Sequence, residues 1–309
     1  MTQTPPSRST AVSRSGFANR LHEATRRCGA PLCVGLDPFP DRIPALFGEG
    51  QKDLTAVTGF FEAILERVTG KCAAIKPQLG FFEPFGPEGA ALARDLTGAA
   101  QAAGIPVILD AKRGDIGSTA EGYMRASLGP FPGFNADCVT VNPYLGLDSL
   151  EPFFAYAEST GKGVAVLVRT SNPGARDLQD LIVDGTPLWV RVAEMLVPAM
   201  ERLAKGAPWS DLMIVAGATY PEEARRLRSI LPKALILAPG YGAQGASAGD
   251  AMAGLVWRPG ANAPPEGGVV SASRSILYPP AAAAARTMEA WRSAIDAAID
   301  AARAELSGA

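Results

Sequence analysis

Eight short apolar runs recur along the chain, and stretches with helical character separate them. Most runs are continuously apolar rather than alternating, which is typical of parallel strands covered by helices on both faces. The pattern predicts a parallel (β/α)8 TIM barrel. The predicted strands are residues 31–38, 72–77, 106–112, 137–143, 163–170, 211–217, 234–240 and 267–273.

The segments between these runs predict the surrounding helices. Residues 87–104 begin with proline and end with glycine, as helices often do. An extra helix before the first strand is expected to close the bottom of the barrel. This extra helix is predicted at residues 16–29. The remaining helices are predicted at residues 53–68, 187–206, 220–231 and 281–306.

A doubly wound open sheet is the alternative fold, but no G-x-G-x-x-G sequence follows the first strand. We find no internal domain boundary, so residues 15–309 are predicted to form one catalytic barrel domain. Residues 1–14 are polar and are expected to be a disordered tail, with a transit peptide as the alternative. Residues 257–268 form a proline- and glycine-rich insertion that we expect to be mobile.

Composition excludes several classes of function. The 29 basic and 31 acidic residues give a net charge of −2, so we expect neither nucleic acid nor a membrane as a partner. The four cysteines form no C-x-x-C pair and predict buried, reduced thiols in a cytoplasmic protein. The single histidine, His22, is expected on a surface helix. A Ser-His-Asp triad and a histidine-rich zinc site are therefore excluded, and no metal is expected.

Charged residues end three neighbouring strands, where a barrel of this kind carries its active site. Asp37 ends the first strand, Lys76 the second, and Asp110 and Lys112 the third, with Asp115 just beyond. Alternation along a strand places Asp110 and Lys112 on one face. Because a buried charge is costly unless it is paired, we expect a chain of alternating signs. A purely structural ion-pair network is the alternative, but four charges at three strand ends favour a functional site.

The last two strands lead into a candidate phosphate site. Gly240, Gly242 and Gly245 follow the seventh strand, and turns of this kind can present backbone N–H groups to a phosphate. Arg274 follows the eighth strand and offers a planar, charged donor. A surface salt bridge is the alternative role for Arg274.

The sequence DAKRGDIG, residues 110–117, resembles the D-x-K-x-x-D motif of the orotidine 5′-phosphate decarboxylase family. Sugar-phosphate enzymes of the same superfamily share this motif, and the lysine after the second strand favours the decarboxylases. From about residue 15 to the last helix, the chain resembles the longer bacterial branch of the family. Further matching segments, in the same order, are GLDP, IKPQLGFFEPFG, APGYGAQG and SRSILY.

The resemblance implies the catalytic roles. It makes Lys112 the proton donor and Asp110 the acid beside the substrate carboxylate. Lys76 would bridge a ribose hydroxyl and Asp110. Asp115 would reach the active site of a neighbouring subunit, so the resemblance also implies a homodimer.

The resemblance further implies the substrate-binding residues. Asp37 would contact the ribose, Ser171 the pyrimidine amide, and Gln244 and Arg274 the phosphate. Thr119 would reach across the dimer interface. The segment after the fifth strand and the proline-rich insertion differ from the shorter branch of the family.

The implied reaction is decarboxylation of orotidine 5′-phosphate to UMP in pyrimidine biosynthesis. It leaves an electron pair on a ring carbon, which most decarboxylases stabilise with an organic cofactor. The sequence contains no cofactor fingerprint, so we expect no cofactor and assign the stabilisation to the ammonium of Lys112. The alternatives are a metal-dependent sugar-phosphate decarboxylase or aldolase, a Schiff-base lysine enzyme, and a nucleotide-binding protein without catalysis.

Overall fold

The computed structural model describes residues 15–48, 54–242, 245–258 and 263–308. The predicted tail, residues 1–14, lies outside the described residues, and so do Gln244 and the centre of the proline-rich insertion. No helix in these described ranges is both long enough and apolar enough to span a membrane.

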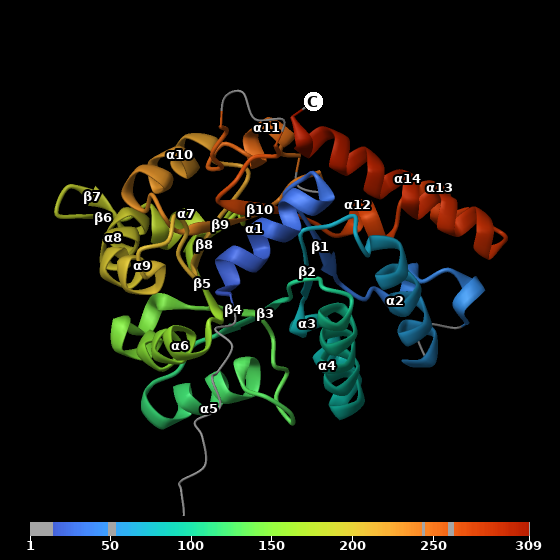
Figure 1. Cartoon of the computed structure of the whole chain (residues 1–309), viewed down its shortest axis with the longest axis horizontal. Coiled ribbons are helices and arrows are strands. Elements are labelled where there is room, and N and C mark those ends of the chain that lie inside the picture. The colour runs from blue at the N-terminus through green and yellow to red at the C-terminus, as the bar shows by residue number, and fades with distance from the viewer. Residues whose placement is uncertain (1–14, 49–53, 243–244, 259–262, 309) are drawn as a thin grey trace, which may run out of the picture.

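Eight parallel strands form one sheet in the order β2-β1-β10-β9-β8-β5-β4-β3. Two isolated parallel bridges, Ile75–Val107 and Gln78–Asp110, join the first and last strands of this order, β2 and β3, and complete the ring. The predicted (β/α)8 barrel is therefore confirmed (Figure 1). The strands are β1 (Leu32–Leu36), β2 (Ala74–Pro77), β3 (Ile108–Arg113), β4 (Cys138–Val141), β5 (Gly163–Arg169), β8 (Leu212–Ala216), β9 (Leu235–Pro239) and β10 (Gly268–Ala272).

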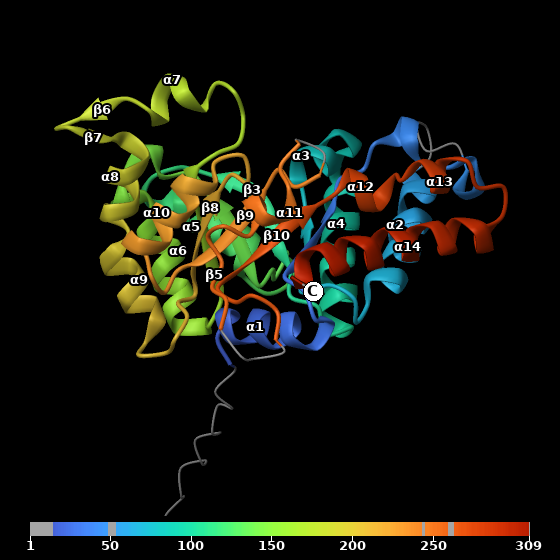
Figure 2. The same cartoon turned by 90° about the horizontal axis from the view of Figure 1, so that it is seen from above.

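Helices surround this ring on its outer side (Figures 1 and 2). The longer ones are α1 (Phe17–Cys28), α2 (Leu54–Val68), α4 (Gly86–Ala102), α5 (Gly117–Leu128), α6 (Leu147–Thr160), α8 (Leu188–Met195), α9 (Val197–Ala204), α10 (Pro221–Ile230) and α14 (Met288–Ser307). The short ones are α3 (Leu79–Phe82), α7 (Ala175–Gln179), α11 (Ala248–Ala251), α12 (Arg274–Leu277) and α13 (Pro280–Ala283). Single turns of 3-10 helix are η1 (Pro40–Arg42), η2 (Ala45–Phe47), η3 (Glu83–Phe85) and η4 (Pro143–Leu145).

Two helices predicted as continuous are each divided, so those predictions are wrong in extent. The predicted helix 187–206 is split into α8 and α9 because Pro198 cannot donate a backbone hydrogen bond and crowds the preceding turn. The predicted helix 281–306 is split into α13 and α14. Thr287 begins α14, where its side chain accepts a hydrogen bond from the backbone N–H of Ala290 at 3.2 Å.

An excursion that the sequence does not predict follows β5. It contains α7 and a small antiparallel hairpin, β6 (Ile182–Val183) and β7 (Thr186–Pro187). Figure 2 shows it standing away from the body of the barrel. Of its residues, only Thr170, Ser171 and Asn172, directly after β5, line the site described below.

Helix α1 closes the base of the barrel, as predicted (Figure 2). Phe17 is fully buried and packs on the backbone of Gly163, where an added Cβ would lie only 2.3 Å from the ring. Leu21 joins the same buried cluster as the cysteines Cys33 and Cys138. All four cysteines are buried and free of disulfides, so the prediction of buried thiols is confirmed.

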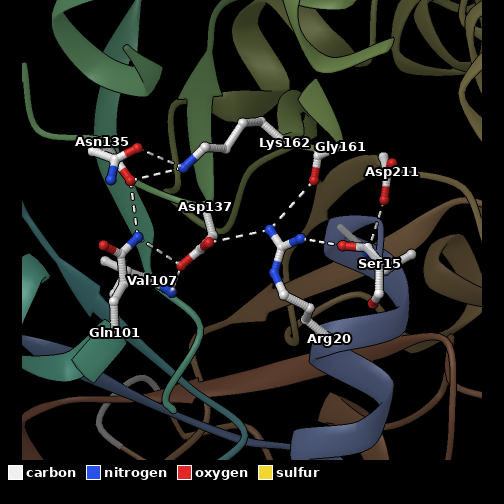
Figure 3. A network of polar contacts seen from close by, with 10 residues as sticks. Ser15, Arg20, Gln101, Val107, Asn135, Asp137, Gly161, Lys162 and Asp211 are labelled. Carbon is white, nitrogen blue, oxygen red and sulfur yellow. Dashed lines mark hydrogen bonds and ion pairs between the residues drawn. The ribbon is translucent and has the colours of Figure 1, made fainter. Parts of the chain in front are cut away.

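Polar contacts fasten this base (Figure 3). Asp137 accepts hydrogen bonds from the Arg20 guanidinium at 3.1 Å, from the Gln101 side chain at 3.1 Å and from the Val107 backbone at 3.0 Å. Lys162 donates to the backbone carbonyl of Asn135, a few residues before β4, at 2.8 Å. Helices α1 and α4 are thereby tied to the beginnings of the strands.

Candidate active site

A cavity of about 430 Å³ opens at the carboxyl ends of the strands, and its lining includes residues of seven of the eight strands and Asp37, which directly follows β1. A ligand here would therefore contact segments that are far apart in the sequence. The predicted site residues that line the cavity are Asp37, Lys76, Asp110, Lys112, Ser171, Gly240 and Arg274.

The carboxylate of Asp110 is the centre of the site. Its Oδ2 accepts from Lys76 Nζ at 2.8 Å and from Gln78 Nε2 at 3.0 Å. Its Oδ1 accepts from Lys112 Nζ at 2.7 Å and from Thr140 Oγ1 at 2.8 Å. Two cations and two neutral donors thus share one buried carboxylate, and the structure brings together the three charges expected from β2 and β3.

These charges remain ionised in spite of their burial. Burial alone would raise the pKa of Asp110, but Lys76 and Lys112 outweigh it and hold the pKa well below its ordinary value of 3.8. Burial alone would lower the pKa of Lys76, but the charges of Asp110 and Asp37 raise it above its ordinary value of 10.5. The buried pair is therefore an ammonium and a carboxylate at neutral pH.

Lys112 reaches this carboxylate through an irregularity in β3. The pairing of β3 with β4 shifts its register between Leu109 and Arg113, and Lys112 has a left-handed φ of 46°. Such a conformation costs roughly 1–3 kcal/mol for a residue other than glycine and concentrates at functional sites. The simple alternation used in the sequence prediction therefore does not apply here.

Thr140 on β4 supports this irregular backbone. Its hydroxyl accepts hydrogen bonds from the backbone N–H groups of Ala111 at 3.0 Å and Lys112 at 2.9 Å, while it donates to Asp110. The side chain of Lys112 is 46% exposed, so its ammonium also faces the cavity. The backbone of Lys112 is thus held by Thr140, while its ammonium contacts Asp110 and also faces the cavity.

Asp37 lies in the cavity but outside the predicted chain of ion pairs. In the described part of the chain it forms no ion pair with Lys76, and its buried Oδ1 has no hydrogen-bond partner. Tyr278 holds the backbone instead, because its hydroxyl donates to the Asp37 carbonyl and accepts from Phe39 N–H, both at 3.0 Å. A buried oxygen without a partner is costly, so this position favours a donor supplied by a ligand.

Asp115 and Thr119 do not line the cavity of their own chain. Asp115 accepts from the backbone N–H of Ile116 at 2.8 Å, and Thr119 is exposed on α5. That both residues act in the site of a neighbouring subunit stays a prediction.

The candidate phosphate site follows the neighbouring strands β9 and β10. Arg274 is exposed at the start of α12 and makes no ion pair with any residue that the structure describes. Gly240, Gly242 and Gly245 have φ values of 109°, 70° and 86°, which residues with side chains rarely adopt. Gln244, in the same turn, lies outside the described residues.

The sequence prediction missed several polar residues in the cavity. Gln78 could have been found because it follows Lys76 by two positions and so points to the same side. Thr140 is the one polar residue within the run Cys138–Val141, which is otherwise apolar. Other polar lining residues, which gave no distinct signal, are Thr170, Asn172, Ser271 and Ser273.

Fold and site together define a class: an α/β barrel with an acid–base cluster at the mouth, beside a glycine-rich turn and an arginine that forms no ion pair with the described residues. The model of the family described as "Orotidine 5'-phosphate decarboxylase / HUMPS family" matches residues 30–287. The chain belongs to this family.

Individual relatives agree with this assignment. An orotidine 5′-phosphate decarboxylase of Rhodopirellula baltica is 40% identical over 272 residues, covering 85% of this chain and 88% of the relative. One of Paracidovorax citrulli is 42% identical over 296 residues, covering 91% and 98%. The solved structure of Leishmania donovani OMP decarboxylase has a TM-score of 0.71 at 34% identity, covering 93% of this chain and 99% of that one. These names describe carboxy-lyases, so the chain is an enzyme of that class.

Proposed function

We propose that this protein decarboxylates orotidine 5′-phosphate to UMP, as a step of pyrimidine biosynthesis in the cytoplasm, without metal or organic cofactor. The observation that carries the proposal is the position of Lys112, whose ammonium contacts the buried carboxylate of Asp110 at 2.7 Å and whose side chain is 46% exposed where it lines the cavity. The family relationship supports the choice of substrate.

The proposed step is a proton transfer coupled to loss of carbon dioxide. The bond between C6 and the carboxylate breaks, and its electron pair stays on C6. The Lys112 ammonium stabilises this charge and then donates a proton to form the new C6–H bond. Lys112 is left as a neutral amine, which regains a proton from water.

Asp110 and Lys76 prepare this transfer. Asp110 orients the ammonium of Lys112 and favours its charged form. Lys76 keeps Asp110 ionised, so that a negative charge faces the substrate carboxylate and disfavours it relative to the product.

The rest of the cavity binds the nucleotide in this proposal. Arg274 and the glycine turn with Gln244 bind the phosphate, and Ser171 recognises the pyrimidine amide. The unpaired oxygen of Asp37 accepts a hydrogen bond from a ribose hydroxyl. Phosphate binding is remote from C6, so its binding energy can hold the reactive end in place.

A homodimer belongs to the same proposal, with Asp115 and Thr119 completing the partner's site. Beside Asp115 stands Ile116, which is 58% exposed. The neighbouring loop after β4 carries Tyr144, 75% exposed, and Leu145, 46% exposed. Exposed apolar side chains on adjoining loops are typical of a protein–protein interface.

Mixing inactive variants tests the dimer. Lys112→Ala and Asp115→Ala subunits, each inactive alone, should regain about a quarter of wild-type activity after exchange, because a two-fold dimer of unlike subunits contains one intact site. The absence of any recovery in mixtures proven to exchange subunits would refute the shared site.

The function is tested by following the loss of orotate absorbance from orotidine 5′-phosphate in the presence of a chelator. We expect full turnover with no added metal or coenzyme. Turnover that requires a divalent cation would instead favour the sugar-phosphate decarboxylase or aldolase. Within the described ranges, no three His, Cys, Asp or Glu side chains are grouped to bind a metal ion.

A further inference from the structure

The excursion after β5 is fastened to the end of that strand by neighbouring residues. Gln179, at the end of α7, accepts from the backbone N–H of Thr170 at 3.0 Å through Oε1. Its Nε2 donates to the Thr170 hydroxyl at 2.8 Å, and that hydroxyl donates in turn to Asn172 Oδ1 at 2.7 Å. One amide thus satisfies both a donor and an acceptor of Thr170.

The residues on either side form a second connection. Arg169 is 1% exposed and forms an ion pair with Asp180 at 2.8 Å. The same guanidinium binds Glu223 of α10, with Nε 2.5 Å from Oε2, and lies 4.3 Å from the Tyr220 ring centroid. The pairing of β5 with β8 shifts its register between Leu167 and Arg169. Leu167 lines the cavity, whereas Arg169 contacts the outer layer.

The residues that these two connections hold in place line the cavity. Thr170, Ser171 and Asn172 all line it, and the proposed function assigns recognition of the pyrimidine to Ser171. The tip of the excursion gives them little packing support, since Leu181 is 53% exposed and Ile182 is 65% exposed. Polar anchoring therefore has to set where this loop lies.

We propose that Gln179 is a positioning residue for recognition of the pyrimidine base. It fixes the strand end Thr170–Asn172 so that Ser171 can address the ring amide, and it has no part in holding the phosphate. The inference rests on the proposed function and adds a determinant of its specificity. Only a side chain with an adjacent donor and acceptor fits, because Thr170 presents its N–H and a hydroxyl already donating to Asn172.

The test compares the binding of UMP and of ribose 5-phosphate by titration calorimetry. For Gln179→Ala we expect UMP affinity to fall about tenfold or more, in line with loss of two hydrogen bonds. Ribose 5-phosphate affinity should stay within about twofold, because the phosphate site is untouched. Gln179→Glu keeps the size but loses the donor, so it should reproduce the UMP defect.

The control is Gln101→Ala. This glutamine donates to Asp137 at the bottom of the barrel, far from the cavity at the mouth, so its loss should leave both affinities unchanged. If wild type prefers UMP to ribose 5-phosphate and both Gln179 variants keep that preference, the positioning role is wrong. Equal weakening of both ligands would likewise overturn it in favour of a general structural role. If wild type itself shows no preference for UMP, the proposed function fails together with this inference.

Discussion

The mouth and the base of the barrel contain similar charges used in different ways. Each has a pocket lined by three cations and two carboxylates. At the base, every cation donates to a backbone carbonyl. These bonds are Arg20 to Gly161 at 3.3 Å, Arg27 to Gly104 at 2.9 Å and Lys162 to Asn135 at 2.8 Å.

At the mouth, the two lysines bind a side-chain carboxylate instead of a backbone carbonyl. Lys76 and Lys112 share the carboxylate of Asp110, Arg274 has no ionic partner among the described residues, and Asp37 keeps a buried oxygen without a partner. A count of charges does not separate these regions. The distinguishing feature is unused hydrogen-bonding capacity that faces a cavity, which indicates a ligand.

The largest expected difference is between two lysines. Lys112→Ala should lower the decarboxylation rate by about a thousandfold or more, because it removes both charge stabilisation and the proton donor. Its fold should persist, since the side chain is 46% exposed. Lys162→Ala is the matched variant at the base and should keep turnover within about twofold while losing about 1–3 kcal/mol of stability. Steady-state rates and urea unfolding would measure both, and near-normal turnover in Lys112→Ala would refute its role.

A second contrast compares two buried aspartates. Asp110→Asn leaves the buried ammonium of Lys76 without its partner and should cost about 3–5 kcal/mol of unfolding free energy together with most activity. Asp137→Asn keeps one acceptor oxygen at the base and should cost about 1–2 kcal/mol without lowering turnover. Denaturant titration of both variants measures the two losses of unfolding free energy. The comparison fails if Asp137→Asn proves the more damaging to catalysis.

Arginines provide a third contrast. Arg274→Ala should weaken UMP binding by about ten- to a hundredfold, the effect of losing a hydrogen bond to a charged group, with an unchanged melting temperature. Arg27→Ala at the base should leave UMP binding unaltered and lower the melting temperature slightly. An unchanged UMP affinity in Arg274→Ala would exclude it from the phosphate site.

The smallest expected effect concerns how stability depends on pH, which should have opposite signs for Asp110 at the mouth and Asp211 at the base. The pKa of Asp110 is lowered, so its contribution to stability is present above about pH 3.8 and is lost as the pH falls further. Burial raises the pKa of Asp211, which accepts from the backbone N–H of Ala18 at 2.8 Å at the base. Its contribution is complete below pH 3.8 and is lost as the pH rises through the raised pKa.

Melting temperatures between pH 3 and pH 6 would reveal these opposite signs. Relative to wild type, Asp211→Asn should gain stability as the pH rises, by up to about 1.4 kcal/mol per pH unit. The stability that Asp110→Asn loses relative to wild type should be smallest at the lowest pH. Parallel pH profiles for the two variants would remove this distinction between mouth and base.

The sequence could predict the barrel because short, continuous apolar runs that alternate with helical stretches are typical of parallel strands covered on both faces. It could also predict that Lys76, Asp110 and Lys112 meet, because parallel strands end at one edge. The backbone irregularity at Lys112 could not be predicted, since it depends on a hydroxyl that β4 supplies from Thr140. The hairpin after β5 was missed because its strands are only two residues long, with β6 exposed and β7 half-buried, so neither gives a buried apolar run.

Isotope exchange tests the central claim about Lys112 most directly. If its amine delivers the proton to C6, the reverse transfer must also occur, and wild-type enzyme should exchange the C6 hydrogen of UMP for deuterium in heavy water. Proton NMR should show this exchange slowed by about a thousandfold in Lys112→Ala and unchanged in Lys162→Ala. Exchange at the wild-type rate in saturated Lys112→Ala would contradict the account.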